Sequence, residues 1–133
     1  MKYFIRDFDR RSFDARAQKL RDIAEEMNKK YGEGKVEVEI VESYYNMREK
    51  IEPVPHVVNI VIEAMKQCNI PSKVRAIRGG TDGAQLSFMG LPCPNIFAGG
   101  LNFHGPHEFL PIPSLKKASE LVVKIIELTA QRG

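Results

Sequence analysis

Two loops of this sequence gather residue types that could do chemistry. The first is Arg78-Gly79-Gly80-Thr81-Asp82-Gly83. Its glycines would let a ligand approach the backbone closely, and the planar guanidinium of Arg78 suits a carboxylate. The same residues are also typical of a tight turn in which Thr81 or Asp82 caps the following helix. At the level of residue types, both interpretations stay open.

The second loop, residues 99–109, contains His104, His107 and Glu108 close together. Imidazole and carboxylate groups at this spacing are compatible with a divalent metal ion. The pattern is not His-Glu-x-x-His, so the helical metal site of the zincins is excluded. A catalytic zinc needs about three protein ligands, so this short cluster does not by itself establish a metal site. The competing interpretation is a loop histidine that bonds to the backbone.

Three other residues are weaker candidates. His56 follows Pro55 and is better explained as the first residue of a helix. Cys93 lies between two prolines, with no base or helix N-terminus in the sequence that would activate a thiol nucleophile. In the Tyr44-Tyr45-Asn46 cluster, which we interpret as packing, Asn46 is the one residue that could face a ligand.

The composition limits the function classes. The chain has 133 residues, of which 43% are hydrophobic and 28% charged, as in a soluble globular protein. Its net charge of +3 is mild and its charges are interspersed, so there is no basic stripe for nucleic acid. No apolar run reaches the roughly 18 residues of a membrane span.

The location predicted from these features is cytoplasmic. The N-terminus passes directly into a strand-like pattern, which indicates no signal peptide. Cys68 and Cys93 form no Cys-x-x-Cys pair and fit a reduced protein, although two cysteines also allow one disulfide.

The elements expected to position the loops fall into two blocks that meet at about residue 50. In the first block, residues 3–8 predict a strand, Ser12 is the expected helix cap, and residues 36–40 alternate as in a half-buried strand. The helix between them is predicted from an apolar stripe at spacings of three and four, formed by Phe13, Ala17, Leu20, Ala24, Met27 and Tyr31. This block is β-α-β.

The second block begins after Pro53 and Pro55 and is predicted as α-β-α-β-α. Its expected elements are a helix over 57–65, a strand at 74–77, a short helix over 84–89, a strand at 95–98 and a final helix. We expect Ser114 to cap the final helix and its apolar residues, Leu115, Ala118, Leu121, Val122, Ile125 and Leu128, to face inward. The predicted class is α/β, with helices packed on a sheet, and each block alone holds only half of a sheet.

Several motifs, taken in order, resemble one family. They are Ile5-Arg6-Asp7-Phe8-Asp9, Tyr45-Asn46-Met47, the Arg78 turn, Gly-Leu-Pro-Cys-Pro-Asn-Ile-Phe at 90–97 and Phe-His-Gly-Pro-His-Glu-Phe at 103–109. Together they resemble the tripeptide aminopeptidase branch, the peptidase T family, of the dizinc aminopeptidase and carboxypeptidase superfamily. The resemblance spans nearly the whole chain.

The resemblance implies a fold and a domain division. Members of this family have an α/β catalytic domain with two zinc ions and an inserted ferredoxin-like lid domain. Residues 1–50 then correspond to the C-terminal half of the lid, or dimerisation, domain. Residues 51–133 correspond to the C-terminal part of the catalytic domain, so both halves of the predicted sheet would be incomplete.

The resemblance also implies roles for individual residues. His104 matches the last zinc ligand, with Glu108 as the acidic residue shortly beyond it and His107 as a neighbour. Arg78 matches the arginine that holds the terminal carboxylate of a tripeptide. The remaining substrate contacts implied by the resemblance are Gly79, Gly80 and Thr81 in the same pocket, and Arg6 and Asn46 from the lid.

What the family's active site further requires is not present as a motif in this chain. The upstream His-x-Asp, the bridging aspartate, the Glu-Glu pair with the general base and a further carboxylate ligand have no counterpart. We therefore assign no catalytic residue here and predict that the isolated chain does not hydrolyse peptides. The alternative function is a non-catalytic binding or assembly module, forming a homodimer or associating through open sheet edges.

Overall fold

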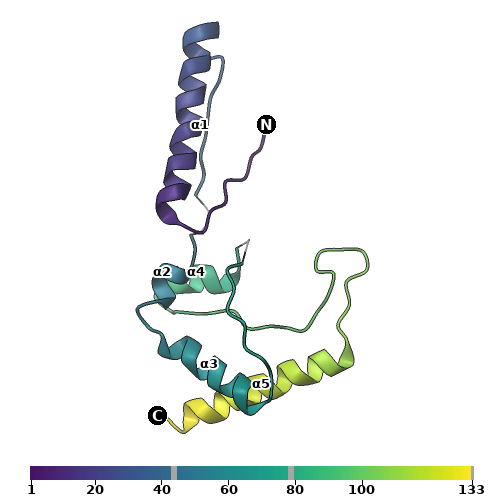
Figure 1. Ribbon diagram of the computed structural model, residues 1–133. Coiled ribbons are helices and arrows are strands. Elements are labelled where there is room, and N and C mark those ends of the chain that lie inside the picture. The colour runs from purple at the N-terminus through teal and green to yellow at the C-terminus, as the bar shows by residue number, and fades with distance from the viewer. Residues whose placement is uncertain (43–44, 78–79, 133) are drawn as a thin grey trace.

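The computed structural model describes residues 1–42, 45–77 and 80–132 and consists of two parts (Figure 1). The first part is an arm, made of α1 (Arg10–Tyr31) and the extended residues on either side of it. The second part is a helical unit, which contains α2 (Arg48–Ile51), α3 (His56–Gln67), α4 (Asp82–Phe88) and α5 (Ile112–Ala130). The helices predicted from the apolar stripes are thus confirmed.

The N-terminus of α1 is capped by Asp9, so the prediction that Ser12 is the cap is wrong. The Asp9 carboxylate accepts a hydrogen bond from the Ser12 backbone N–H at 2.8 Å, which places Ser12 in the first turn. Asp7 supports this start, since its carboxylate accepts the Asp9 N–H at 3.1 Å and Arg16 Nε at 2.7 Å. These hydrogen bonds to the charged forms lower the pKa of both aspartates below the usual value of 3.8.

One side chain ties the segment after α1 back onto that helix. Gly32, with a φ of 106°, lets the chain leave α1, and the following residues run back alongside it (Figure 1). Asn28 then donates from Nδ2 to the Val36 carbonyl at 2.9 Å and accepts the Val36 N–H at 2.8 Å through Oδ1. Both backbone polar groups of Val36 are therefore satisfied by a side chain instead of by a neighbouring strand.

The core of the helical unit lies where α3 packs against α5. Ala64 of α3 and Leu121 of α5 are fully buried, and Leu128 is nearly so. Phe97, from the segment between α4 and α5, packs on the same core. In the loop after α3, Asn69 adopts a left-handed φ of 53° and Ile70 N–H bonds to the Met65 carbonyl at 2.8 Å, which closes the helix.

The strands predicted at 3–8, 36–40, 74–77 and 95–98 are not found in the described parts of the chain. These segments are extended, but the single ladder contact among the described residues is an isolated antiparallel bridge between Leu101 and Phe109. Apolar side chains in or beside them are exposed, with Phe4 at 73%, Val41 at 77% and Val74 at 76%. The alternating pattern indicates a backbone suited to a sheet, and a strand forms only where a neighbour supplies the ladder.

The start and the buried face of α5 also differ from prediction. Pro111 precedes the helix, which begins at Ile112, so Ser114 lies inside the first turn and is not the cap. Pro113, the second residue of the helix, is accepted there because the first backbone N–H groups of a helix have no partner within it. Leu115 and Val122 are 46% and 42% exposed instead of buried, because the α3 contact covers a narrower face centred on Leu121.

We predict that Leu121→Ala destabilises the helical unit. Removing a fully buried leucine side chain leaves a cavity between α3 and α5 and should cost roughly 2–5 kcal/mol of the free energy of unfolding. Urea unfolding followed by circular dichroism measures this change. Val123→Ala is the matched control because Val123 is on the same helix and 54% exposed; an equal loss in both variants would contradict a core centred on Leu121.

Candidate functional site

The first candidate loop is described from Gly80 onward. Arg78 and Gly79 lie outside the described residues, and Gly80 is exposed. Thr81 caps α4, accepting the Ala84 N–H at 3.3 Å through Oγ1, as the capping interpretation of this turn predicts. The same oxygen accepts a hydrogen bond from Asn95 Nδ2 at 3.2 Å. The turn is thereby attached to the segment that follows α4.

A close backbone approach holds α4 against residues 91–95. A Cβ added at Gly83 would lie 2.6 Å from the Cys93 carbonyl oxygen, a distance that requires the two to separate. Ser87, one turn further along α4, is 1% exposed. Its hydroxyl donates to the Gly83 carbonyl at 2.6 Å and accepts the Cys93 N–H at 2.9 Å. Gly83 is thus required for packing, in addition to any role beside a ligand.

Ser87 and Asn95 were not selected from the sequence, and both matter to this loop. Their signal would have been a serine four residues after a helical glycine, and an asparagine just before an apolar segment. Such residues often bond to nearby backbone or to a cap. Neither pattern is specific enough to identify the pairing in advance, because the contacts join residues six and fourteen positions apart.

The second candidate loop is closed on itself by backbone and side-chain hydrogen bonds. Leu101 and Phe109 exchange N–H to carbonyl bonds of 2.9 and 3.2 Å, which bring the two ends of the loop together. Asn102 and His104 have left-handed φ angles of 56° and 64°. A histidine in this conformation is uncommon, and such backbone is found where the surroundings enforce it.

The acidic residue of this loop enforces the conformation of His104. The Glu108 carboxylate accepts the backbone N–H of His104 at 3.0 Å. The Asn102 side chain donates to the His107 carbonyl at 3.3 Å across the same turn. His104 itself is exposed. Glu108 therefore orients the backbone that carries the His104 imidazole, while the His104 side chain stays accessible.

Two glycines fix the start of the histidine loop. Gly99 has a φ of 85°, and a Cβ there would lie 2.8 Å from the Ser114 Cβ. A Cβ on Gly100 would lie 2.6 Å from Cζ of the Phe103 ring. The loop thus starts packed against the first turn of α5, and it projects away from α4 (Figure 1).

The two predicted lid contacts lie on the arm or beside it. Arg6 is exposed, and its guanidinium carbon is 5.7 Å from the centroid of the Phe4 ring. Asn46 donates to the Phe8 carbonyl at 3.2 Å and accepts the Arg48 N–H at 3.0 Å. Within residues 1–42, 45–77 and 80–132, no hydrogen bond or ion pair joins Arg6 or Asn46 to the Thr81 turn or the histidine loop.

The described residues do not form a complete metal site. Across them, no group of three or more histidine, cysteine, aspartate and glutamate side chains is arranged to hold a metal ion. His56 is the first residue of α3, as predicted. Cys68 and Cys93 are free thiols. None of the described helices has the length and apolar character that crossing a bilayer demands.

Comparisons with known proteins agree with the order of motifs. A model of the peptidase family M20/M25/M40 matches residues 7–128. All 133 residues align with Peptidase T of Caldanaerobacter subterraneus subsp. tengcongensis at 55% identity, and 130 residues (98% of the chain) with Peptidase T of Geobacillus thermodenitrificans at 56%. Peptidase T of Salmonella newport is 53% identical over an alignment of 138 positions that covers the whole chain. The chain spans 32–33% of the length of these relatives.

We predict that Gly83→Ala lowers stability although it lies within a helix. In an open helix, alanine is favoured over glycine by about 0.5–1 kcal/mol. At Gly83 the added methyl group meets the Cys93 carbonyl at 2.6 Å, so the sign of the change should reverse. Urea unfolding measures it, with Gln85→Ala on the exposed side of α4 as the control. A more stable Gly83→Ala variant would show that α4 and residues 91–95 are not in contact.

Proposed function

Because this chain belongs to the peptidase family M20/M25/M40, we propose that it is the C-terminal part of a zinc-dependent tripeptide aminopeptidase. The observation that carries this proposal is 55% identity over the whole chain to a Peptidase T of which it spans only 32%. Such a parent removes the N-terminal residue from a tripeptide. The proposed location is cytoplasmic, which two free thiols support.

The two-part structure supports a division near residue 50. In the proposal, residues 1–50 form the C-terminal half of a lid and residues 51–133 the C-terminal part of a catalytic domain. The extended residues at 36–40, 74–77 and 95–98 would become strands once the rest of the parent supplies their neighbours. Exposed apolar residues beside them, such as Val41 and Val74, support this because burying them would stabilise the whole protein.

The Arg78 turn would read the C-terminal carboxylate of the substrate. A guanidinium forms two parallel hydrogen bonds to a carboxylate, so a ligand ending at that position is selected by its length. Gly80 and Thr81 would line the same pocket, together with Gly79. The cap at α4 supports this role, since the hydrogen bonds from Asn95 and Ala84 fix the Thr81 hydroxyl. Arg6 and Asn46 would approach the substrate from the lid.

His104 would be the one zinc ligand that this chain contributes. Its exposed imidazole on a backbone held by Glu108 suits a ligand that must be oriented before the metal binds. When bound, zinc activates water and polarises the scissile carbonyl. A single imidazole does not hold zinc firmly, and a general base must also come from elsewhere in the parent. The chain by itself is therefore proposed to be inactive.

A second candidate function is a non-catalytic assembly module. The observation that favours it is the number of large apolar side chains that are exposed on α5 and the extended segments, among them Val123 at 54% and Ile126 at 62%. Patches of this kind are typical of interaction surfaces. This module would form a homodimer or associate through its open edges. A monomer by sedimentation at micromolar concentration would argue against it.

We predict that tripeptide hydrolysis requires both His104 and the rest of the parent. The test combines this chain with the upstream two thirds of a Peptidase T relative and follows tripeptide hydrolysis with added zinc. Losing a residue that hydrogen-bonds to a metal ligand typically lowers activity by about 10- to 100-fold. Losing the ligand itself should cost more, so His104→Ala should lower kcat/KM by more than about 100-fold. His107→Ala is the control and should leave hydrolysis largely unchanged. Hydrolysis by the chain alone would contradict the proposal.

We also predict that Arg78→Lys weakens recognition of the substrate's carboxylate. A lysine cannot reproduce the paired hydrogen bonds of the guanidinium, so KM for a tripeptide should rise while kcat changes less. The same tripeptide with a C-terminal amide lacks the carboxylate and serves as the matched substrate. If both substrates lose activity equally, Arg78 does not read the carboxylate.

A further inference from the structure

The arm and the helical unit contact each other through the side chain of Tyr45. Among the described residues, helices pack closely in two pairs, α3 with α5 and α2 with α4, and α1 takes part in neither. Tyr45 lies in the segment that leads from the arm into α2. Its ring is 5.9 Å from Phe13 of α1, edge to face, and 5.8 Å from Phe88 of α4. One aromatic ring therefore bridges both parts.

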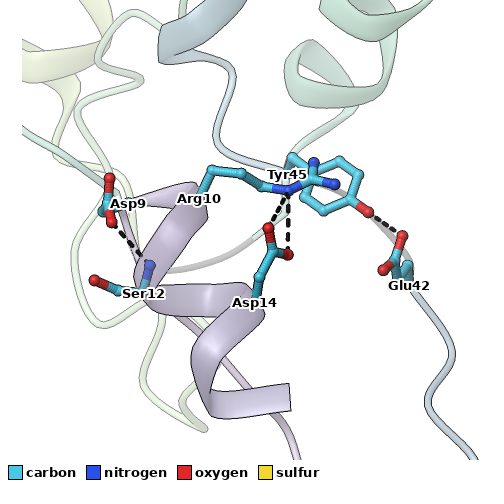
Figure 2. Close-up of polar contacts among 6 residues, drawn as sticks. All are labelled: Asp9, Arg10, Ser12, Asp14, Glu42 and Tyr45. Carbon is cyan, nitrogen blue, oxygen red and sulfur yellow. Dashed lines mark hydrogen bonds and ion pairs between the residues drawn. The ribbon is translucent and has the colours of Figure 1, made fainter. Parts of the chain in front are cut away.

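A cation from the start of α1 covers this ring. The Arg10 guanidinium carbon lies 3.4 Å from the Tyr45 ring centroid. Its Nε also donates to both carboxylate oxygens of Asp14 at 3.3 Å, which fixes the guanidinium in place (Figure 2). Attraction between a cation and an aromatic face depends on this alignment.

The ring is held at its other edge as well. Figure 2 shows the Tyr45 hydroxyl pointing away from Arg10's side chain toward the Glu42 carboxylate, to which it donates a hydrogen bond. This bond raises the pKa of Tyr45 above its usual value of 10.0. Beyond Tyr45, Asn46 donates to the Phe8 carbonyl and ties the same segment to the residues before α1.

We propose that Arg10, Tyr45 and Phe88 form a clasp that sets the orientation of the arm relative to the helical unit. Arg10 and Phe88 come from the two parts, and Tyr45 is the shared contact between them. Because the Arg10 side chain is 45% exposed, the clasp is a surface contact that can open without unfolding either part. Opening it would let the orientation of the arm relative to the helical unit change.

The clasp acts on the distance between the proposed substrate contacts. Arg6 lies on the arm, whereas Thr81 and His104 lie on the helical unit. A change in the angle of the arm changes how far apart these groups stand. Only this consequence rests on the proposed function, because the orientation of the arm can be measured on the chain itself.

The test measures the distance distribution between two spin labels by electron paramagnetic resonance. The labels are attached at Lys19→Cys on α1 and Lys66→Cys on α3, both exposed positions, in a Cys68→Ser and Cys93→Ser background. The clasp predicts a single narrow distribution. Tyr45→Ala and Arg10→Gln should each broaden and shift it, while Tyr45→Phe, which keeps the ring, should preserve most of the narrow component.

Two controls on α1 match Tyr45 and Arg10 in residue type. Tyr31→Ala removes an exposed tyrosine that also has a cation over it, Lys30 at 5.0 Å, but at the far end of α1. Arg11→Gln removes the neighbouring exposed arginine. Both should leave the distribution unchanged, and circular dichroism should report the same helix content in every variant.

The outcomes show whether the contacts of Arg10 and Tyr45 set the orientation of the arm. A distribution that stays narrow and unshifted in Arg10→Gln and Tyr45→Ala, with helix content intact, would overturn the proposal. Broadening in Tyr45→Ala alone would remove Arg10 from the clasp and overturn it as stated. If Tyr45→Ala loses helix content, Arg10→Gln, which deletes only a surface cation, gives the decision. Since no activity is measured, failure of the peptidase proposal leaves this result unaffected.

Discussion

The packing of α3 against α5 is the contact on which the helical unit depends. Leu121 and Ala64 are fully buried there. Phe97, in the segment between the two candidate loops, packs against the same core. One loop is attached to this unit at Gly83 and the other at Gly99, each through an approach too close for a side chain. The position of both loops therefore depends on one small core and on two glycines.

Among the described residues, polar side chains take the place of sheet neighbours at three backbone positions. Asn28 pairs with both polar groups of Val36, Ser87 accepts the Cys93 N–H, and Glu108 accepts the His104 N–H. In each case a backbone group that lacks a ladder partner is satisfied by a nearby polar side chain. In the part of the chain that the structure describes, these local bonds keep the segments and loops in defined positions without a sheet.

The helices were predictable because their apolar stripes are local and periodic, as the stripe from Phe13 to Tyr31 shows. Their caps were less so: Asp9 and Ser12 both suit a cap, and only the supporting bonds of Asp7 and Arg16 favour Asp9. The strands could not be predicted from local sequence alone. The alternation at 36–40 favours a strand conformation, but a strand also needs a neighbouring strand to pair with, which this segment does not specify. For the site, residue types offered Thr81 or Asp82 as the cap, of which Thr81 is the one found, but they did not indicate the bond between Glu108 and the His104 backbone.

The segment that Asn28 holds has a further consequence for the handling of this protein. Glu37 and Glu39 occupy alternate positions along it and so share one face of the extended backbone. If two copies paired antiparallel with Glu37 opposite Glu39, carboxylates would stand opposite carboxylates, and their repulsion would oppose that register. The alternation that makes the segment resemble a strand thus also disfavours one register in which two copies could pair.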